Sequence, residues 1–509
     1  MILEEILLSI PYEILQGCEQ IEITGVTEDS REVKEGILFC CIKGQHADGH
    51  KLIQTAVQNG ASALLVERRP TVPVPDGIAV IMVSDTRRAA GKAAAAFYGH
   101  PAEKLHMIGV TGTKGKTSLT YMLQQILQQA QISCGLIGTN GYQYGHRMES
   151  VAHTTPTACC LQRILWEMVE AGCQAVVMEV SSIGMKEKRC SGIIFEYGIF
   201  TNFAPDHIGG EEHKSIEEYL FWKMQMFCQC KNGILNFDDP VSRQICTRIS
   251  SCKWAGYGIE NNKKSIESIA ESWYLAANPS GFQNDTILGM TFTLQTAEEL
   301  SVPIRLPMPG LYNVSNALGA AACFLELIGG KKQKTHANCL QKGLSQVRIP
   351  GRTEVIGTYH GAKIMVDYAH NASGLEKLLV GLKEYAPSRI LCVFGCGGGR
   401  SKVRRREMGE VSSRLADLVI LTEDNSREEE PEEIIREIRQ GMDTDTVCQV
   451  ILDRKAAIFY ALEKAQPGDF VIVAGKGHEA YQEKKGVRYP FSDREVIEEL
   501  MKSIVGRNQ

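Results

Sequence analysis

Short hydrophobic runs alternate along the chain with longer segments in which apolar residues recur every three or four positions. The short runs are typical of β-strands, and the longer segments are typical of amphipathic α-helices. Four runs that are mostly apolar follow one another at residues 134–139, 174–181, 197–202 and 233–237. Such runs predict parallel strands that helices cover on both faces. The pattern therefore predicts an α/β protein built on mostly parallel sheets.

The alternation falls into three blocks, which we interpret as three domains. Residues 1–103 contain strand-like runs at 36–42, 61–67 and 78–84 and an alanine-rich helix at 91–100 that Pro101 stops. Residues 104–347 hold the four buried runs, a further strand at 105–110, and antiparallel strands at 272–278, 289–296 and 300–308. Residues 348–509 repeat the alternation with strands at 363–370, 390–397, 418–424 and 469–477. We predict a smaller N-terminal α/β domain, a doubly wound central domain and a Rossmann-like C-terminal domain.

Charge and cysteine content exclude several classes of protein. The 509 residues include 55 Lys and Arg against 60 Asp and Glu, so neither nucleic acid nor an anionic membrane is expected as a partner. No apolar run is long enough to span a bilayer, and the N-terminus carries acidic residues where a signal peptide has basic ones. Seventeen cysteines without a C-x-x-C motif argue against a disulfide framework. We expect a protein of the reducing cytoplasm.

The octapeptide TGTKGKTS at 111–118 stands between a predicted strand and a predicted helix. Backbone N–H groups at this position can hold phosphate oxygens, Lys116 can meet the outer phosphates, and the Thr117 hydroxyl can meet Mg²⁺. The usual spacing places a glycine where this chain has Val110, with glycines at Gly109 and Gly112 instead. An ordinary glycine-rich turn is the alternative. We predict ATP binding by Gly112, Thr113, Lys114, Gly115, Lys116, Thr117 and Ser118.

Other polar residues follow the predicted strands, where open α/β sheets place their sites. Glu179 follows the apolar run at 175–178 and suits Mg²⁺, although an exposed strand end is an even alternative. His207 could bind a metal or lie in a turn. Asn313 and Asn316, one helical turn apart, could hold a nucleotide base or cap a helix. Further candidates follow in Arg352, Asp367 and His370.

Taken in order, these motifs resemble the Mur ligase family, the ATP-dependent amide ligases that build the stem peptide of peptidoglycan. The resemblance covers essentially the whole chain. It is greatest to the members that add the third residue, joining meso-diaminopimelate to UDP-N-acetylmuramoyl-L-alanyl-D-glutamate. The matching motifs are DSR, DGH, GVTGTKGKTS, HTTPT, MEVSS, TNFAPDH, FWKMQMF, NVSNALGA, GRTE, DYAHN, FGCGGGR, LTEDNSREEEP and VAGKGHEAYQ.

The resemblance implies an acyl-phosphate mechanism that uses ATP and Mg²⁺. Phosphoryl transfer depends on positioning and charge neutralisation, so no protein nucleophile is needed. Lys223 matches the family lysine that is carbamylated, which turns a cation into an anion able to bind Mg²⁺. Without the resemblance, Lys223 would be taken for a surface lysine of a helix. The implied metal residues are Thr117, Glu179, His207 and Lys223, the implied catalytic residues are Lys116, Glu179, His207 and Lys223, and the implied nucleotide residues beyond the loop are Asn313, Asn316, Arg352, Asp367 and His370.

The resemblance also implies sites for two small-molecule substrates and gives the domains their roles. Residues 1–103 would bind the UDP-sugar, 104–347 ATP, and 348–509 the amino acid, in a chain expected to be a monomer. The implied residues for the UDP-muramoyl dipeptide are Ser30, Thr154, Thr155, Ser181, Glu187 and Arg189, and those for the amino acid are Arg405, Asn425, Arg427, Gly475 and Glu479. An arginine meets a distal carboxylate through two parallel hydrogen bonds, and lysine has no such carboxylate. Arg427 therefore favours diaminopimelate.

The chain departs from the family pattern at several places, and alternatives stay open. Ser426 replaces a proline and loosens the loop before Arg427; the other departures are Ile183, Glu187, His213 and Gly399. L-Lysine or another diamine could be the acceptor, and a paralogue could act on a different muramyl or polyglutamyl substrate. An inactive nucleotide-binding protein is disfavoured by the four catalytic residues. A P-loop kinase is disfavoured by the motifs DNSR and GKGHE, and a folylpolyglutamate synthetase by GKGHE and the N-terminal motifs.

Overall fold

The structure, a computed structural model, describes residues 1–44, 47–205, 213–259, 263–284, 287–329 and 334–505. The chain forms two compact units, Met1–Tyr274 with Gly319–Cys339 and Leu275–Leu318 with Leu340–Gln509. The predicted limits of the three domains, 1–103, 104–347 and 348–509, do not coincide with this division and stay predictions.

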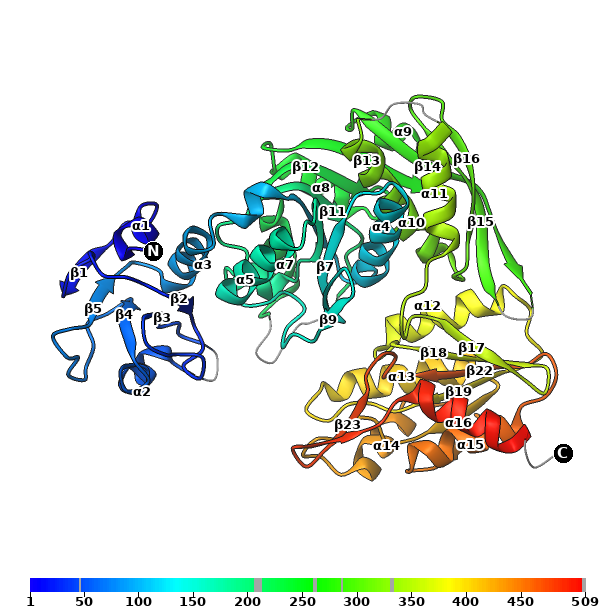
Figure 1. Cartoon of the computed structure of the whole chain (residues 1–509). Helices are drawn as coiled ribbons and strands as arrows, with labels where there is room; N and C mark the ends of the chain where they lie inside the picture. Colours follow the sequence, from blue (N-terminus) through cyan, green and yellow to red (C-terminus); the bar gives the residue numbers. More distant parts are fainter. Residues whose placement is uncertain (45–46, 206–212, 260–262, 285–286, 330–333, 506–509) are drawn as a thin grey trace. The chain divides into compact units, whose positions relative to one another are not determined.

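The N-terminal part of the first unit is a five-stranded sheet with helices on both faces (Figure 1). Its elements are α1 (Leu3–Leu7), β1 (Glu13–Gln16), β2 (Gly25–Thr27), β3 (Ile37–Cys40), α2 (Ile53–Gln58), β4 (Ala61–Val66), β5 (Ala79–Met82) and α3 (Thr86–Phe97). The strand order is β1-β5-β4-β3-β2, and only β1 and β5 are antiparallel. Side chains of α1 and α3 pack on one face, and those of α2 pack on the other.

Helix α3 begins earlier and ends earlier than the predicted helix at 91–100. Asp85 caps it, because the carboxylate accepts a hydrogen bond of 3.0 Å from the backbone N–H of Arg88. The helix ends at Phe97, and a left-handed backbone at His100 (φ 53°) turns the chain before Pro101. A side chain at Gly91 would lie 2.6 Å from the carbonyl oxygen of Ser191, which explains the small residues of this helix.

The large sheet has 11 strands in the order β16-β15-β14-β13-β12-β11-β6-β10-β7-β8-β9. Its strands are β6 (His106–Thr111), β7 (Cys134–Gly138), β8 (Gly141–Tyr144), β9 (Arg147–Glu149), β10 (Ala175–Glu179), β11 (Phe195–Phe200), β12 (Cys230–Asn236), β13 (Lys253–Ile259), β14 (Ser272–Gln283), β15 (Leu288–Thr296) and β16 (Ser301–Leu306). The helices of this part are α4 (Lys116–Gln129), α5 (Ala158–Glu170), α6 (Ser182–Lys186), α7 (Ile216–Gln225), α8 (Val241–Arg248), α9 (Lys263–Glu267), α10 (Leu311–Leu327) and α11 (Lys334–Ser345). From β13 to β7 the strands whose pairing is described are parallel, whereas β15 and β16 pair antiparallel, as predicted.

Strand β6 lies at the point where the strand order reverses. The chain leaves β6 through α4 to reach β7, and β10 and β11 then take the places on either side of β6. A crevice at the carboxyl end of the strands forms at such a switch point, and ligands bind there in open α/β sheets. The segment 111–118 follows β6 directly, so the topology places the predicted phosphate loop at this crevice.

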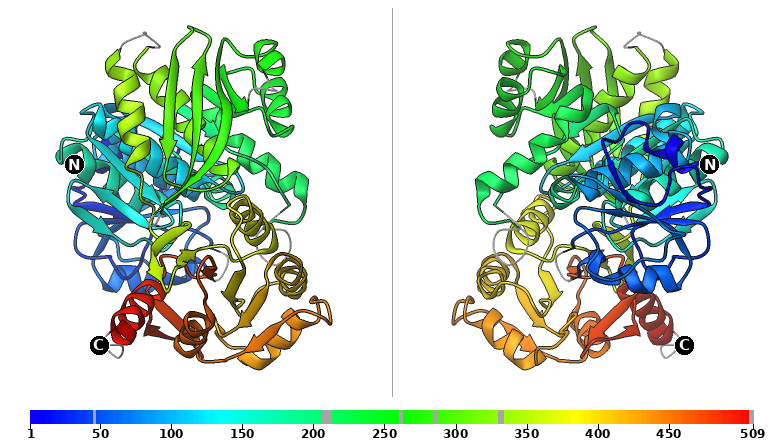
Figure 2. Two further views of the ribbon diagram at one scale, coloured as in Figure 1. Left: turned by 90° about the vertical axis from the view of Figure 1, so that its right-hand side faces the viewer. Right: turned by 90° about the vertical axis from the view of Figure 1, so that its left-hand side faces the viewer.

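The second unit contains a six-stranded sheet in the order β17-β18-β22-β19-β20-β21. Figure 2 shows strands and helices of this part of the chain in yellow to red. Its elements are β17 (Glu354–Tyr359), β18 (Ala362–Asp367), α12 (Ala372–Lys383), β19 (Ile390–Phe394), α13 (Lys402–Leu415), β20 (Leu418–Leu421), α14 (Pro431–Arg439), β21 (Cys448–Val450), α15 (Arg454–Lys464), β22 (Phe470–Ala474), the hairpin β23 (Tyr481–Lys484) and β24 (Val487–Pro490), and α16 (Asp493–Val505). All neighbours in the six-stranded sheet are parallel except β17 and β18. Helices α15 and α16 pack on one face. The predicted fold class is confirmed.

Strand β22 comes late in the chain but lies in the middle of this sheet, between β18 and β19. Ala474 pairs with Asp367 of β18, and Val473 pairs with Val393 of β19. The turn at 475–479 therefore leaves the sheet between the segment that follows β18 and the segment that follows β19. Residues predicted to bind nucleotide and residues predicted to bind amino acid both lie next to this turn.

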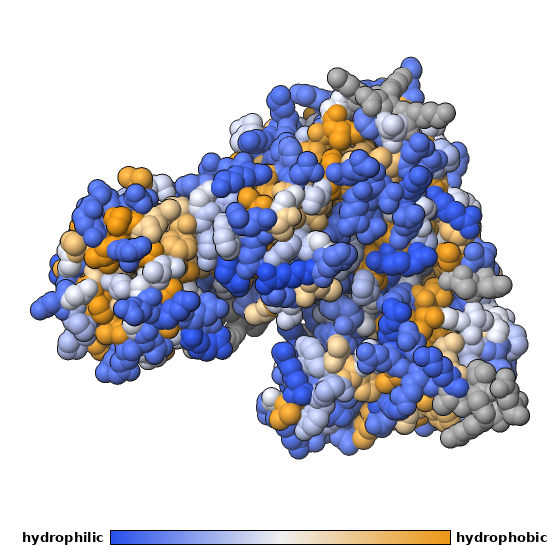
Figure 3. Space-filling model, in the orientation of Figure 1, coloured by the Kyte–Doolittle hydropathy of each residue, from blue (hydrophilic) through white to orange (hydrophobic). Residues whose placement is uncertain are grey.

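On the face that Figure 3 shows, hydrophobic side chains form small patches among hydrophilic ones. Among the helices that the structure describes, none is long and apolar enough to cross a membrane.

A buried ion pair joins α15 to α16. Arg454 and Asp493 are 1% and 0% exposed, and the guanidinium meets the carboxylate through two hydrogen bonds of 2.7 and 2.8 Å. The same guanidinium donates to the carbonyl oxygen of Ala474 at the end of β22 (2.9 Å). The pair thus fixes the strand end from which the turn at 475–479 begins.

We expect Asp493→Asn to lower the free energy of unfolding by about 3–5 kcal/mol, because it leaves a buried guanidinium without its anion. Urea denaturation followed by circular dichroism measures the loss. Glu499→Gln on the same helix is the matched control, since its pair with Lys455 is exposed and should contribute less than about 1 kcal/mol. Equal effects of the two substitutions would contradict the assigned role of the buried pair.

Candidate functional site

The segment 111–118 forms a loop with the backbone geometry of a phosphate site. Gly112 has a φ of 146°, and a side chain there would collide with the Thr201 hydroxyl. Gly115 has a φ of 86° and directly precedes the first residue of α4. Both glycines are therefore required by the turn. Gly109 has a different role, because it lies inside β6 and leaves room for the ring of Phe195.

Residues that the sequence did not single out hold this loop in place. Asn202 accepts from the backbone N–H of Thr113 through its carbonyl (2.8 Å) and from that of Lys114 through its side chain (3.0 Å). Tyr219 of α7 donates to the Thr113 hydroxyl (3.2 Å). The ammonium of Lys116 bends back onto the carbonyl oxygens of Gly112 (2.9 Å) and Thr113 (3.2 Å). These anchors fix the loop and place its lysine over it.

Glu179 at the end of β10 is 1% exposed and belongs to a chain of hydroxyl groups. Its Oε1 accepts hydrogen bonds from the Thr117 hydroxyl (2.9 Å) and from the backbone N–H of Thr139 (3.0 Å). Its Oε2 accepts from the Thr139 hydroxyl (3.2 Å), which in turn contacts the Thr154 hydroxyl (3.1 Å). The Glu179 carboxylate and three threonine hydroxyls thus gather at the phosphate loop, and hard cations such as Mg²⁺ prefer oxygen ligands.

Lys223 lies on α7 and points at the phosphate loop. It is 2% exposed, and its ammonium donates to the carbonyl oxygen of Gly112 (2.7 Å) and lies 4.4 Å from the centre of the Tyr219 ring. It is therefore a buried residue of the site, and its reading as a surface lysine is wrong. An ammonium at this position repels a metal cation, whereas a carbamate on the same nitrogen would attract one.

The metal set can be described only in part. His207 lies outside the described residues. Within the described part of the chain, no group of three or more His, Cys, Asp and Glu side chains could hold a metal ion. His213 is 1% exposed, and its Nε2 lies 2.9 Å from the Ser182 hydroxyl.

Four of the six residues predicted for the muramoyl dipeptide form one cluster. The buried Thr155 hydroxyl contacts the carbonyl oxygen of Glu179 (3.0 Å) and the Ser181 hydroxyl (3.2 Å). Arg189 donates to the carbonyl oxygen of Thr155 (2.8 Å) and pairs with Glu187. Glu187 also lies 3.8 Å from Arg87, so the departure from the family glutamine places an anion between two arginines.

The two remaining residues of this set lie outside the cluster. Thr154 contacts Thr139, which links it to Glu179. Ser30 lies in the loop after β2, where its carbonyl oxygen accepts from the side chain of Asn59 (3.2 Å).

In the second unit, three predicted nucleotide residues surround Tyr368 at the end of β18. The guanidinium of Arg352 lies 4.7 Å from the centre of the Tyr368 ring, and the ring of His370 lies 4.7 Å from the same ring. Asp367 accepts from the backbone N–H of Thr353 (2.6 Å) and of Ala369 (2.7 Å). Burial raises the pKa of Asp367, and the nearby Arg352 opposes that shift.

Asn313 and Asn316 lie at the start of α10 in the same unit. Asn313 donates to the carbonyl oxygen of Pro309 (2.8 Å) and accepts a longer bond from Asn316 (3.5 Å). The neighbouring Tyr312 hydroxyl lies 3.5 Å from that of Thr353, which connects this helix to the residues around Tyr368.

Two predicted amino-acid residues meet in the second unit. The side chain of Asn425 donates to Oε2 of Glu479 (2.8 Å), and its Oδ1 accepts from the backbone N–H of Glu483 (2.9 Å). Gly475 has a φ of 111°, and a side chain there would lie 2.6 Å from the Asp424 carboxylate. The structure therefore places Asn425, Gly475 and Glu479 in one neighbourhood.

Arg427 lies in a loop that is tied down from both sides. Its φ of 52° is left-handed, its N–H donates to the carbonyl oxygen of Glu483 (3.1 Å), and its guanidinium donates to that of Gly398 (2.7 Å). Ser426, which replaces the family proline, is 3% exposed and donates to the Glu423 carboxylate (2.6 Å). This hydrogen bond holds Ser426 in the structure, and the expected loosening of the loop stays a prediction.

Arg405 is 1% exposed and already paired within the protein. Its guanidinium meets both oxygens of Glu429 (2.8 Å each) and one oxygen of Glu437 (2.7 Å). Arg405 lowers the pKa of Glu429 to about 2, and the same carboxylate accepts from the N–H of Gly399 (2.6 Å). Arg405 therefore supports the glycine-rich loop at 397–399, and its direct contact with an amino acid stays a prediction.

The sequence matches three family descriptions in order along the chain. They are "Mur ligase family, catalytic domain" at 22–98, "Mur ligase middle domain" at 110–324 and "Mur ligase, glutamate ligase domain" at 351–477. The chain is also similar to UDP-N-acetylmuramoyl-L-alanyl-D-glutamate--2,6-diaminopimelate ligase of Clostridium perfringens, with 36% identity over 503 residues that cover 98% of this chain and 99% of the relative. The chain belongs to the Mur ligase family.

Solved structures agree with this membership. A structure of UDP-N-acetylmuramoyl-L-alanyl-D-glutamate--2,6-diaminopimelate ligase is 28% identical, has a TM-score of 0.69 and matches over 99% of both chains. A MurF ligase from Thermotoga maritima in complex with ADP is 18% identical with a TM-score of 0.61 over 95% of this chain and 98% of that one, which shows a shared fold. The predicted family and the prediction of a ligase are confirmed.

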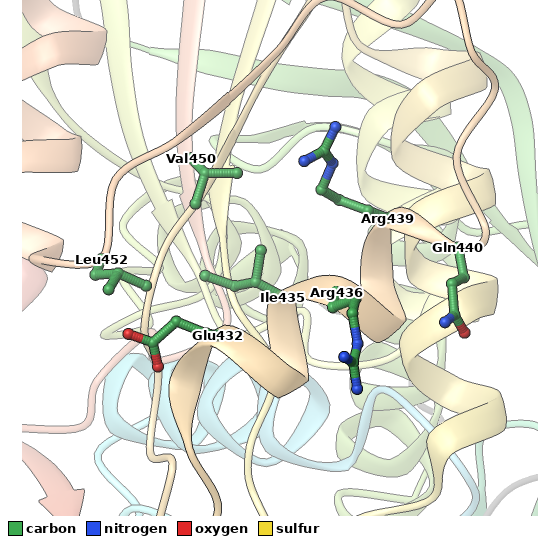
Figure 4. A pocket seen from close by; sticks show the side chains of 7 residues that line it. All are labelled: Glu432, Ile435, Arg436, Arg439, Gln440, Val450 and Leu452. Carbon is green, nitrogen blue, oxygen red and sulfur yellow. The ribbon is translucent and has the colours of Figure 1, made fainter.

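A separate pocket of this Mur ligase lies between α14 and the segment that follows β21 (Figure 4). It has a volume of about 520 Å³, and Ile435, Val450 and Leu452 form its apolar lining. Its other lining residues are Glu432, Arg436, Arg439 and Gln440. None of the predicted site residues is among these seven, so the pocket has no part in the predicted site.

His478 is a further residue that sequence reasoning missed. It follows Gly477. Its backbone N–H lies so close to Gly351 that a side chain at position 351 would collide with the nitrogen of His478. Its ring lies 5.0 Å from that of Tyr368, and its buried Nδ1 has no hydrogen-bond partner among the described residues. Burial, and then the charge of Arg352, lowers the pKa of His478 to about 4. The motif GKGHE was the signal that could have found it.

His478 should therefore stay neutral above about pH 4 in this Mur ligase, whereas an unfolded histidine titrates near 6.5. Between these pH values the unfolded chain binds more protons than the folded chain. The contribution of neutral His478 to the free energy of unfolding is therefore complete at pH 7.5 and should be lost as the pH falls from about 6.5 to about 4. Urea midpoints at pH 7.5 and 5 should differ less in His478→Gln than in the wild type. His360→Gln, at a turn between β17 and β18, is the control that should retain the wild-type difference.

Proposed function

We propose that this Mur ligase joins meso-diaminopimelate to UDP-N-acetylmuramoyl-L-alanyl-D-glutamate at the expense of ATP, in peptidoglycan precursor synthesis. It acts in the cytoplasm as a monomer with Mg²⁺. The observation that carries the proposal is the phosphate loop hydrogen-bonded to the buried Glu179, in a chain similar from end to end to ligases of that name. An ADP complex of a related fold supports ATP as the nucleotide.

In the first step the D-glutamyl carboxylate attacks the γ-phosphorus of ATP, which forms an acyl phosphate and releases ADP. The protein supplies charge and position and no nucleophile. The backbone N–H groups at the start of α4 hold the phosphate oxygens. Lys116 exchanges its two carbonyl partners for phosphate oxygens and neutralises the charge that develops on them.

The residues beside the loop fit Mg²⁺ if Lys223 is carbamylated. Thr117 and Glu179 offer oxygen atoms, which suit this ion, and His207 completes the proposed set. Unmodified Lys223 opposes a cation, so its carbamate is part of the proposal. Bound Mg²⁺ supplies neutralising charge to the phosphate oxygens. Unmodified Lys223 lies buried against Gly112, and this position supports a carbamate next to the loop.

In the second step the acceptor amine attacks the acyl carbon, and the tetrahedral intermediate expels phosphate. The cluster of Thr155, Ser181 and Arg189 lies at the carboxyl end of β10 and supports the muramoyl dipeptide in this role. Its arginine is the charged group for a substrate carboxylate or phosphate. Residues 1–103, with Ser30, bind the uridine end.

Residues around β20 and the turn after β22 bind the distal end of the acceptor. Diaminopimelate carries a carboxylate and an ammonium at that end. Arg427 is proposed to bind the carboxylate and Glu479 the ammonium; the hydrogen bond from Asn425 to Glu479 supports the second assignment. L-Lysine is the second candidate, favoured by Ser426 and Gly399 at positions where the diaminopimelate pattern has proline and aspartate.

An amino-acid panel tests the function. The purified chain, ATP, Mg²⁺ and the UDP-muramoyl dipeptide are incubated with meso-diaminopimelate, L-lysine or other diamines, and phosphate release is measured. We expect diaminopimelate to be preferred and Lys116→Ala to be inactive. If none of the acceptors in the panel gives phosphate release, the ligase reaction is contradicted. If lysine gives an equal or higher rate than diaminopimelate, only the assignment of diaminopimelate as the acceptor is contradicted.

Lys223→Ala should be almost inactive, because it removes the proposed carbamate. Short-chain carboxylates such as acetate should restore part of the activity by supplying the missing anion, as measured by phosphate release. The exposed Lys231→Ala on β12 is the matched control and should keep full activity. Activity of Lys223→Ala without added carboxylate would show that the carbamate is not needed.

Arg427→Ala should lower kcat/KM for diaminopimelate by an amount equivalent to about 2–5 kcal/mol, because it breaks a charge pair with the substrate. The ratio of kcat/KM for diaminopimelate to kcat/KM for lysine should fall. Arg427→Lys should recover only part of the loss, since a point charge cannot form two parallel hydrogen bonds. Arg436→Ala on the exposed side of α14 is the control and should leave kcat/KM for both amino acids unchanged. An unchanged preference in Arg427→Ala would assign the carboxylate to another residue.

A further inference from the structure

Lys476 lies in the turn that follows β22, and the proposed function leaves it without a role. Its side chain is 0% exposed, one of the largest fully buried side chains of the chain. Burying an ammonium is costly unless anions and hydrogen-bond acceptors surround it. The environment of Lys476 must therefore be built to hold it.

The partners of Lys476 are residues predicted to bind the amino acid. Its ammonium donates to Oδ1 of Asn425 (3.0 Å) and to Oε2 of Glu479 (3.1 Å). Asn425 donates to the same oxygen of Glu479 (2.8 Å). Both protein donors therefore meet Oε2, and within the described residues no donor reaches Oε1. The protein therefore orients this carboxylate through one of its two oxygens.

The local charge agrees with an ammonium as that ligand. Asp424 lies 3.7 Å from Lys476, so the buried group contains two carboxylates and one ammonium. Its net charge is one negative unit, which a ligand ammonium would balance. The ammonium of Lys476 lies 5.4 Å from the centre of the Tyr481 ring, and the guanidinium of Arg488 lies 4.4 Å from the centre of the same ring.

We propose that Lys476 is a positioning residue that sets specificity for an acceptor with a distal ammonium group. It holds Glu479 and Asn425 in the orientation in which Oε1 of Glu479 meets that ammonium. The inference rests on the proposed ligase function and adds a residue to its acceptor site. Lys476 itself does not touch the reacting atoms.

L-2-Aminopimelate separates this role from the others, because it keeps the distal carboxylate of diaminopimelate and lacks the distal ammonium. In Lys476→Met we expect KM for diaminopimelate to rise about ten-fold, the effect of a weakened charged contact, with a smaller change in kcat. The kcat/KM for 2-aminopimelate should change less than about two-fold. Arg427→Ala should instead lower kcat/KM for both substrates, because both carry the distal carboxylate. Lys455→Met, at an exposed pair on α15, is the matched control.

Two further measurements keep the outcome decisive. Hydroxylamine intercepts an acyl phosphate without using the acceptor site, so hydroxylamine-dependent phosphate release should be unchanged in Lys476→Met. Its absence in the wild type would overturn the ligase function and with it the role of Lys476, whereas release in the wild type with unchanged acceptor specificity in Lys476→Met would overturn the role of Lys476 alone. The double variant Asp424→Asn/Lys476→Met keeps the local net charge, and we expect the same selective loss.

For each variant we compare the ratio of kcat/KM for diaminopimelate to kcat/KM for 2-aminopimelate. The proposal is overturned if this ratio in either variant stays within about two-fold of the ratio in the control. It is also overturned if both variants lose hydroxylamine-dependent release, because Lys476 would then only maintain the fold. If only Lys476→Met loses hydroxylamine-dependent release, the kcat/KM ratio of the two substrates in the double variant decides whether the proposal holds.

Discussion

A buried carboxylate at the end of β10 determines how the first unit builds its site. Glu179 is almost completely removed from water, and an anion in that position must be satisfied by hydrogen bonds or by a cation. Thr117 at the start of α4 and Thr139 after β7 both donate to it. One residue thus joins the ends of β10 and β7 to the start of α4. The phosphate loop, the proposed metal oxygens and the threonines near the dipeptide cluster all take their positions from this point.

The buried central strands of the fold could be predicted from the sequence, whereas the edge strands and the exact ends of the helices could not. Strands such as β10 and β19 are buried on both faces and appear in the sequence as unbroken apolar runs. The edge strands β9 and β21 and the hairpin of β23 and β24 are short, partly exposed and rich in polar residues, so no hydrophobic pattern marks them. The limits of α3 depended on a cap at Asp85 and a left-handed residue at His100, which composition alone does not reveal.

The candidate site divides in the same way. Motifs that lie within one turn of chain, such as the phosphate loop, were visible because their geometry is local. Partners that come from separate strands were missed. Thr139 meets Glu179 only because β7 pairs with β10. Lys476 meets Asn425 only because the turn after β22 contacts the segment that follows β20. The burial of Lys223 also depends on tertiary packing, and residue patterns alone had favoured an exposed lysine.

The position of β22 has a consequence for the order in which the chain is made. Residue 363 of β18 pairs with residue 470 of β22, so more than a hundred residues leave the ribosome between the two partners. Until β22 arrives, β18 and β19 each carry an open edge in the middle of their sheet, and open edges can pair with other chains. A nascent chain that stops before residue 470 therefore has an incomplete sheet, and translation must pass this strand before the second unit can close.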